Sequence, residues 1–311
     1  MSITVDRVKI PPHTWVGIAI LVIAQILLII GVRVVAVWLT PIMWTGYIVA
    51  VDGIVYLLRG HSWLTTQKRE FPFLALISVG VWLVFEAYNL HLQNWYYLGV
   101  PESPWLRNLA YFWSFATIIP GVFETIDLLA ALLKKLRPSS KIRLPSIRTG
   151  SAGLWFILGV GLVVIPLLVP RTLAAYLFAP VWIGYILVFD PINQRIGLPS
   201  IRMALRNGNW WNITIILAAG LVCGVLWESW NYQAMLANGG HWIYTVPEEL
   251  RIFGLHFGQM PVLGLLGFPP FALELVLIYS FIREVFASDS LWPSANKQPN
   301  TLLPRKFIED Q

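Results

Sequence analysis

Residues 15–36 read WVGIAILVIAQILLIIGVRVVA, an apolar stretch that holds one charged residue, Arg33. A helix of about 20 such residues spans the hydrocarbon core of a bilayer. The rest of the 311-residue chain has a similar character, because 57% of it is apolar or aromatic and only 12% is charged. A soluble domain carries about twice that charge. The composition predicts an all-α polytopic membrane protein, and it excludes a secreted disulfide scaffold, a nucleic-acid-binding domain and a disordered chain.

Further apolar stretches follow the first. The first stretch has no small-residue cleavage site before Arg33, so we interpret it as a retained helix and not as a signal peptide. We predict eight membrane spans, near residues 15–36, 38–58, 72–90, 105–133, 151–170, 172–194, 211–230 and 250–282.

The basic residues indicate the orientation. With eight spans, 18 of the 22 Lys and Arg residues fall in the five segments on the side of both termini. The opposite side has only Arg33, Arg107, Arg171 and Arg251. Cytoplasmic loops carry an excess of Lys and Arg. The pattern therefore predicts a multi-pass protein of the cell membrane with cytoplasmic N- and C-termini.

The chain also repeats itself, at an offset that drifts from 138 to 150 residues. The matched segments are Trp44-Thr-Gly-Tyr47 to Asp52 with Trp182-Ile-Gly-Tyr185 to Asp190, Glu86-Ala-Tyr-Asn89 with Glu228-Ser-Trp-Asn231, Trp95-Tyr-Tyr97 with Trp242-Ile-Tyr244, and Pro120 to Glu124 with Pro270 to Glu274. Such self-similarity predicts two parallel four-helix repeats, 1–133 and 151–283, with one orientation in the membrane. A basic cytoplasmic linker, 134–150, joins them, and a cytoplasmic tail, 284–311, follows.

Six acidic residues lie at matched positions inside predicted spans, where each costs about 2.5–3.5 kcal/mol at the helix centre. With a rise of about 1.5 Å per residue, Glu86 and Glu228 fall in the outer half of the membrane. The other four form an inner polar layer, namely Asp52, Asp190, Glu124 and Glu274.

The outer acids are the candidate catalytic residues. A carboxylic acid in apolar surroundings can keep a proton and donate it, and aromatic faces stabilise a neighbouring cation. We therefore predict acid–base chemistry by Glu86, Glu228, Glu248 and Glu249. The candidate substrate-binding residues are Tyr88, Asn89, Trp95, Tyr97, Trp230, Asn231, His241, Trp242, Tyr244 and His256. The alternative is purely structural: Glu and Asn as hydrogen-bonding links between helices, and Trp and Tyr as an interfacial belt.

The last predicted span is rich in Gly and Pro and should unwind around residues 261–270. Broken helices often border a binding site, and a simple proline kink is the alternative. His256 is placed in the outer part of this span. With one cysteine and no facing histidines we expect no metal and no cofactor.

The second half has Glu228, then Trp242-Ile-Tyr244, then Pro247-Glu248-Glu249. This arrangement resembles the membrane-embedded lycopene cyclase domain of carotenoid cyclases, which occurs in pairs. It departs from that pattern because Pro247 is followed directly by two glutamates. The resemblance implies protonation of a polyene, with carboxylates as acid and base.

Three functions remain open. The first is an intramembrane enzyme that acts on an isoprenoid, a carotenoid or another lipid. The second is a transporter of a small solute or lipid, indicated by the parallel repeat and the broken last span. The third is a non-catalytic subunit or assembly factor of a membrane complex. Membrane lipids or an apolar isoprenoid are the expected partners of the first, and no nucleic acid is expected.

Overall fold

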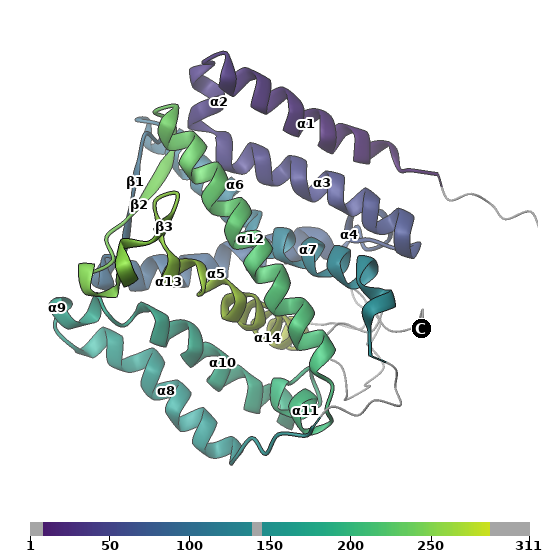
Figure 1. Cartoon of the computed structure of the whole chain (residues 1–311), viewed down its shortest axis with the longest axis vertical. Coiled ribbons are helices and arrows are strands. Elements are labelled where there is room, and N and C mark those ends of the chain that lie inside the picture. Colours follow the sequence, from purple (N-terminus) through teal and green to yellow (C-terminus); the bar gives the residue numbers. More distant parts are fainter. Residues whose placement is uncertain (1–8, 139–144, 287–311) are drawn as a thin grey trace, which may run out of the picture.

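The computed structural model describes residues 9–138 and 145–286, and these residues are mostly helical (Figure 1). The longer helices are α1 (Pro12–Ile29), α3 (Leu39–Arg59), α5 (Glu70–Leu92), α6 (Pro104–Ala116), α7 (Ile118–Leu132), α8 (Ala152–Leu168), α10 (Phe178–Arg195), α12 (Trp210–Leu236) and α14 (Phe268–Phe286). The short ones are α2 (Arg33–Val37), α4 (Trp63–Thr66), α9 (Arg171–Ala174), α11 (Ile201–Arg206) and α13 (Val262–Leu265). The strands are β1 (Trp95–Leu98), β2 (His241–Tyr244), β3 (His256–Phe257) and β4 (Met260–Pro261).

Six helical segments among the described residues are long and apolar enough to cross a membrane. They are α1, α3, α5, α6 with α7, α12, and α13 with α14. The two remaining predicted spans also fold as helices, since α8 is a shorter apolar helix and α10 follows it. The chain is therefore an all-α protein of the membrane type.

Two helix pairs form opposite edges of the fold in Figure 1. Helix α1 packs along α3, and α8 packs along α10. Glycine allows both close approaches, because a Cβ on Gly17 would lie 2.3 Å from the backbone nitrogen of Ala50, and one on Gly159 would lie 2.8 Å from the carbonyl carbon of Leu187. Small residues at helix contacts in membranes have this function.

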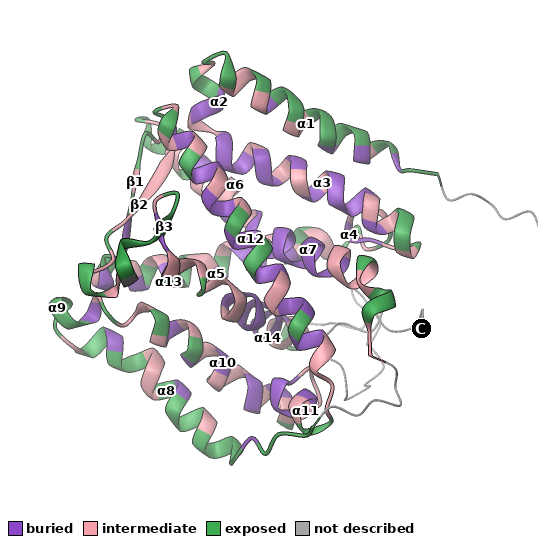
Figure 2. Cartoon of the chain, viewed as in Figure 1, coloured by how far each residue is buried: buried purple, intermediate pink, exposed green. Residues whose placement is uncertain are grey.

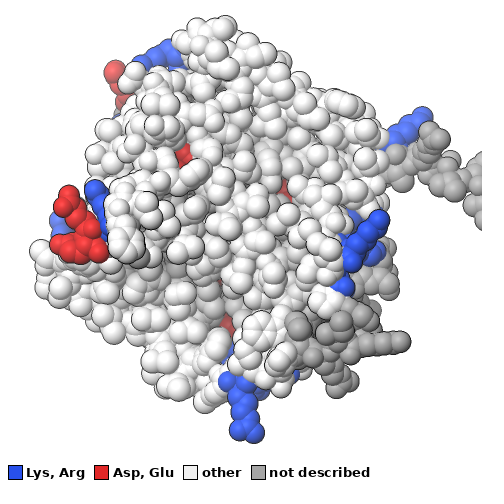
Figure 3. All heavy atoms as spheres, viewed as in Figure 1, with Lys and Arg blue, Asp and Glu red and all other residues white. Residues whose placement is uncertain are grey.

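The centre of the molecule is filled by α7 and α14, whereas the outer faces of α1 and α8 are exposed (Figure 2). The exposed residues there are apolar, such as Ile29 at 82% and Ile157 at 69% exposure. Charged side chains gather at the edges of the visible face, beside the strands and beside α4 and α11, and its broad middle has few (Figure 3). An apolar band between charged ends is the distribution that a bilayer requires.

The structure corrects the last predicted span, 250–282. Residues 248–261 form short 3-10 turns and the β3–β4 hairpin, and α14 begins only at Phe268. The expected unwinding around 261–270 therefore lies mostly earlier in the chain. Pro269 and Pro270 occupy the first turn of α14, where the missing amide hydrogens cost little. His256 lies in β3 and not in a helix.

Candidate functional site

The Trp-x-Tyr segments of the two halves pair with each other. Strands β1 and β2 are antiparallel, with Trp95 opposite Tyr244 and Tyr97 opposite Trp242. Directly opposed residues share a face, and so do residues two apart along a strand. All four aromatic side chains therefore project from one face of this two-stranded sheet.

Two asparagines attach the strands to their own halves. Asn89 of α5 accepts hydrogen bonds from the backbone amides of Asn94 and Trp95, and its amide group donates to the Trp95 carbonyl oxygen. Asn231 of α12 bonds both the amide and the carbonyl of Trp242 in the same manner. Each asparagine thus acts as a backbone surrogate that fixes where its strand begins.

Glu86 of α5 lies beside β1, and one of its carboxylate oxygens accepts three hydrogen bonds. The donors to its Oε1 are the Tyr97 hydroxyl at 2.5 Å, Trp82 Nε1 at 2.9 Å and Trp95 Nε1 at 3.1 Å. Its side chain is half-buried. The carboxylate therefore organises the aromatic side chains of its own half.

Glu228 occupies the matched position below β2 and is completely buried. Its Oε2 accepts from the Asn231 amide at 3.3 Å and from the Tyr244 hydroxyl at 3.4 Å. Its Oε1 accepts from the backbone amide of Gln259 at 2.5 Å. Gly258 makes this approach possible, because a Cβ there would lie 2.5 Å from Oε1.

A cavity of about 320 Å³ lies against the aromatic face of β1 and β2. Both halves line it, and none of the described residues along its wall is Lys, Arg, Asp or Glu. Tyr97 and Tyr244 are both part of the wall, whereas Glu86 and Glu228 stand one side chain behind it. Ligand sites are typically apolar cavities of roughly 300–1,000 Å³ with a few placed polar groups, and this cavity fits that description.

The tyrosine hydroxyls at the cavity are held in the neutral form. Burial raises the pKa of Tyr97 and of Tyr244 well above the usual range, and the neighbouring charges of Glu86 and Glu228 raise each pKa further. Each hydroxyl therefore stays protonated and lies between a glutamate carboxylate and the cavity.

Several predicted residues take other positions. Tyr88 donates to the Val163 carbonyl oxygen, and the Trp230 ring packs edge-on against Trp44, so neither lines the cavity. Glu248 and His256 are exposed. His241 does line the cavity, with Nδ1 placed 2.9 Å from the Gly239 carbonyl oxygen.

Glu249 is also exposed, and it accepts a hydrogen bond from the Tyr176 hydroxyl at 2.9 Å. The carboxylate of Glu249 accepts hydrogen bonds from its own backbone amide and from the Tyr176 hydroxyl, and both lower the pKa of Glu249. Tyr176 is part of the cavity wall, so Glu249 also stands one side chain behind the cavity. Because its carboxylate is exposed and its pKa is lowered, Glu249 is a poor proton donor to a molecule bound there.

The sequence patterns missed part of the wall. Trp82, Asn94, Phe178 and Trp227 carry no signal that separates them from other residues of apolar spans. The repeat matched Trp182 with Trp44, but it did not indicate that Trp182 belongs to a site. Aromatic rings close the wall, as where Phe178 lies 4.9 Å from Trp95 between ring centres.

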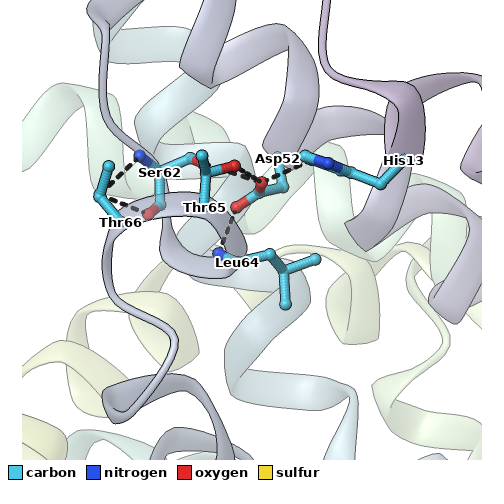
Figure 4. Close-up of polar contacts among 6 residues, drawn as sticks. All are labelled: His13, Asp52, Ser62, Leu64, Thr65 and Thr66. Carbon is cyan, nitrogen blue, oxygen red and sulfur yellow. Dashed lines mark hydrogen bonds and ion pairs between the residues drawn. The ribbon is translucent and has the colours of Figure 1, made fainter.

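Among the inner acids, Asp52 binds the segment that follows its own helix (Figure 4). It accepts from the Leu64 amide at 2.7 Å, from the Ser62 hydroxyl at 2.8 Å and from the Thr65 hydroxyl at 3.3 Å. His13 Nε2 of α1 lies 2.9 Å from the same carboxylate. This acid therefore fastens the turn into α4.

Asp190 has the corresponding role in the second half, where it accepts from the backbone amides of Ile201 and Arg202 at the start of α11. Both aspartates thus bind the start of the short helix that follows. In each half the aspartate therefore fixes the turn that leads into the short helix.

The other two inner acids differ. Glu124 and Glu274 are completely buried, and within the described part of the chain no hydrogen bond is found for their carboxylate oxygens. Asp127, which sequence reasoning missed, binds Arg59 at 3.0 Å and Trp63 Nε1 at 3.0 Å. Within the described ranges no cluster of three or more His, Cys, Asp or Glu residues is arranged to hold a metal ion.

Comparisons with models of protein families, with curated proteins and with solved structures find no match to this chain.

Proposed function

We propose that this chain is an intramembrane acid–base enzyme that acts on an isoprenoid or similar lipid bound in the cavity. The observation that carries the proposal is the arrangement of two glutamate–tyrosine pairs, Glu86 with Tyr97 and Glu228 with Tyr244, at one apolar cavity. Intramembrane carboxylates with a defined partner are by default functional candidates.

The two pairs suit a reaction that leaves the proton count unchanged. One pair starts with a protonated carboxyl, and its tyrosine hydroxyl passes a proton to an alkene carbon while the carboxyl reprotonates the tyrosine oxygen. The other tyrosine takes a proton from a neighbouring carbon and passes its own proton to the second carboxylate. The result is an isomerised or cyclised alkene, formed by general acid–base catalysis.

The aromatic wall supports the same chemistry. Protonation of an alkene creates a carbocation, and the faces of Trp, Tyr and Phe stabilise a cation by about 0.5–2 kcal/mol each. Trp82, Trp95 and Trp227 lie along the wall. Because none of the described residues along the wall is Lys, Arg, Asp or Glu, ions have little to bind there.

We further propose that the chain is an internal duplication with a single central site. Matched positions line the cavity in pairs, such as Pro41 with Ala179 at the offset of 138, and Ile118 with Phe268 at the offset of 150. The two helix pairs at the edges of the fold and the aspartates that bind the following turns are also matched. This arrangement agrees with two repeats of four membrane-spanning helices each, in the cell membrane, with both termini of the chain in the cytoplasm.

The resemblance of Glu228, Trp242-Ile-Tyr244 and Pro247-Glu248-Glu249 to lycopene cyclase domains agrees with a polyene substrate. In this chain Glu248 and Glu249 are exposed to solvent, although Tyr176, which donates to Glu249, is part of the cavity wall. We therefore assign the acid–base roles to Glu86 and Glu228 alone.

Deuterium incorporation tests the proposal. The purified full chain, in lipid nanodiscs in D₂O, is incubated with lycopene, farnesene and farnesol, and mass spectrometry counts the deuterons that enter carbon. We expect incorporation by the unmodified chain. Loss of a general acid or base costs about 10²–10⁴-fold in rate, so Glu86→Gln and Glu228→Gln should each fall by that factor.

The control variant is Glu284→Gln, which removes an exposed carboxylate at the end of α14 and should react at the full rate. Thermal unfolding of every variant verifies that it is folded. Incorporation at the full rate by the Glu86→Gln/Glu228→Gln double variant overturns the proposal. So does the absence of incorporation from all three probes, and binding without incorporation then favours the non-catalytic alternative.

A further inference from the structure

A second cavity, of about 420 Å³, lies where the segment before α8 meets α11. Its described wall consists of Arg206 and of residues 146–150, among them Arg148. Both arginines are exposed, and no acidic residue belongs to the described wall. Basic side chains also project beside α11 in the space-filling view (Figure 3). The wall therefore combines a cavity with two guanidinium groups.

Hydrogen bonds fasten this segment to α11. The Ile147 amide donates to the Leu205 carbonyl oxygen at 3.2 Å. Arg206 donates through Nε to the Thr149 hydroxyl at 3.1 Å and through Nη2 to the Gly150 carbonyl oxygen at 3.3 Å. A guanidinium has five donor hydrogens in a planar fork. Arg206 can therefore hold the wall and still donate to a ligand.

A third arginine, Arg202, stands behind the wall and is only 1% exposed. It donates to the same two acceptors, the Thr149 hydroxyl at 3.3 Å and the Gly150 carbonyl oxygen at 2.7 Å. It also donates to Gln194 Oε1 at 3.1 Å, and its guanidinium lies 5.4 Å from the centre of the Trp155 ring. Arg202 thus fixes the shape of the wall and adds a buried positive charge to it.

Neighbouring acids do not balance this charge. Within the described ranges, no Asp or Glu forms an ion pair with Arg148, Arg202 or Arg206. Asp190 is buried near Arg202, and its carboxylate accepts hydrogen bonds from the backbone amides at the start of α11. One negative charge beside three positive charges leaves a cavity that attracts anions.

The cavity lies where α8 enters the apolar band. Helix α8 begins at residue 152, directly after the wall, and Leu154 and Ile157 in its first two turns are 54% and 69% exposed. Trp155 packs under Arg202, and Trp210 donates to the backbone just before the wall. Tryptophan is enriched at the level of the lipid headgroups. A phosphate at this level would continue into hydrocarbon chains along α8.

We propose that this cavity binds the headgroup phosphate of an anionic phospholipid, with Arg148 and Arg206 as its hydrogen-bond donors and the lipid chains along α8. Basic pockets beside membrane helices bind such headgroups, and guanidinium groups form charge-assisted hydrogen bonds with phosphate oxygens. None of the described residues lines both this cavity and the aromatic one. The lipid site is therefore independent of the proposed catalytic function.

Two phospholipids with identical chains test the proposal. The purified full chain in dodecyl maltoside micelles is titrated with dioleoyl phosphatidylglycerol or with dioleoyl phosphatidylcholine, and native mass spectrometry counts the bound lipids. One basic side chain near an anionic headgroup raises the affinity about fivefold. With two arginines, we expect the anionic lipid to bind about 25-fold more tightly than the zwitterionic one.

Three variants remove the charge of the cavity in different ways. Arg148→Gln changes a side chain without a hydrogen bond or ion pair in the described part of the chain, so it should fold normally and lose about fivefold in the preference. Arg148→Gln/Arg206→Gln should bind the two lipids equally. Ser146→Glu keeps every arginine contact and places an acidic group in the wall, so it should also weaken binding of the anionic lipid.

Lys68→Gln/Arg69→Gln is the matched control. It removes two exposed basic residues before α5, outside the cavity wall, so the net charge changes as in the double variant. This control should keep the full preference. The proposal is overturned if Arg148→Gln/Arg206→Gln keeps the preference, or if the control loses as much of it.

Glycerol phosphate, a headgroup without chains, distinguishes a lipid from a free phosphate ester. We expect that it does not displace phosphatidylglycerol at equal concentration, because it cannot place chains along α8. Displacement at equal concentration would overturn the assignment to a lipid. Thermal unfolding of every variant verifies that the chain is folded. Deuterium incorporation has no part in this test, so the lipid site and the catalytic proposal fail separately.

Discussion

The stretch before Pro120 in the first half and the stretch before the matched Pro270 in the second half fold differently. In the first half this stretch is the helix α6, with one proline, Pro104, at its first position. In the second half it contains the β3–β4 hairpin and the short helix α13. Gly254 and Gly258 both have positive φ there, at 66° and 61°. Such backbone is accessible to glycine at little cost.

The difference changes the surroundings of the two outer glutamates. Glu86 is held by side chains alone, namely those of Trp82, Trp95 and Tyr97. Glu228 is held by side chains and also by the Gln259 amide, which is available because its segment is not helical. Unwinding one helix thus makes two like carboxylates unlike, and two carboxylates with different roles need different environments.

The largest effect should come from the asparagines that fix the strands. Asn231→Leu leaves the Trp242 amide and carbonyl without their side-chain partner. Asn231 is completely buried, so water cannot take its place. At about 1–3 kcal/mol per unsatisfied group, we expect a loss of about 4 kcal/mol in the free energy of unfolding. Asn89→Leu should cost about half of that, because Asn89 is half-buried and water can replace its bonds.

Thermal unfolding of both variants in the same detergent measures this difference. Equal losses would show that the two strands are fixed equally strongly. The two asparagines would then contribute equally to stability, although Asn231 is more deeply buried than Asn89.

An intermediate effect should come from the unwound segment. In Gly258→Ala the new Cβ meets Glu228 Oε1, whereas in Gly254→Ala it meets no atom within 4 Å. Both variants carry the strain of a positive φ, about 1–2 kcal/mol, so Gly254→Ala is the control for strain. We expect Gly258→Ala to unfold at the lower temperature and to lose deuterium incorporation as well. Unfolding temperatures that match would mean that Glu228 can move away without penalty.

The smallest effect should come from the serines of the inner turns. Ser62→Ala removes a donor to Asp52, a completely buried carboxylate, and should cost about 2 kcal/mol. Ser200→Ala removes the N-terminal cap of α11, where the hydroxyl accepts from the Met203 amide, and should cost about 1 kcal/mol. Chemical denaturation curves of the two variants give the comparison. A larger loss for Ser200→Ala would reverse it.

Much of the fold could be predicted because a bilayer imposes a simple rule. Every apolar stretch long enough to span must satisfy its own backbone, and a helix does so. The positions of Asp52, Asp190, Glu86 and Glu228 could be located from the repeat, since a polar residue that recurs inside apolar spans is unusual. The predicted start of the last span, at residue 250, was wrong, because Gly and Pro permit several backbone conformations and the tertiary contacts decide among them.

The site was only partly predictable. Tyr97, Trp95 and Glu86 were selected by residue type, and they do lie together. The pairing of β1 with β2 depends on two loops far apart in the chain, and no local pattern encodes their register. Trp82 and Trp227 were missed because an aromatic residue of the wall and an aromatic residue in contact with lipid look alike in sequence.

By itself, the sequence determined the class of protein and the places where charge enters the apolar spans, because burial of charge in lipid is costly enough to leave a visible pattern. Only the tertiary structure decided that both halves meet at one cavity and that Glu86 and Glu228 reach it through tyrosines. These features depend on the distances between helices, and packing sets those distances through many small contacts that no single residue reveals.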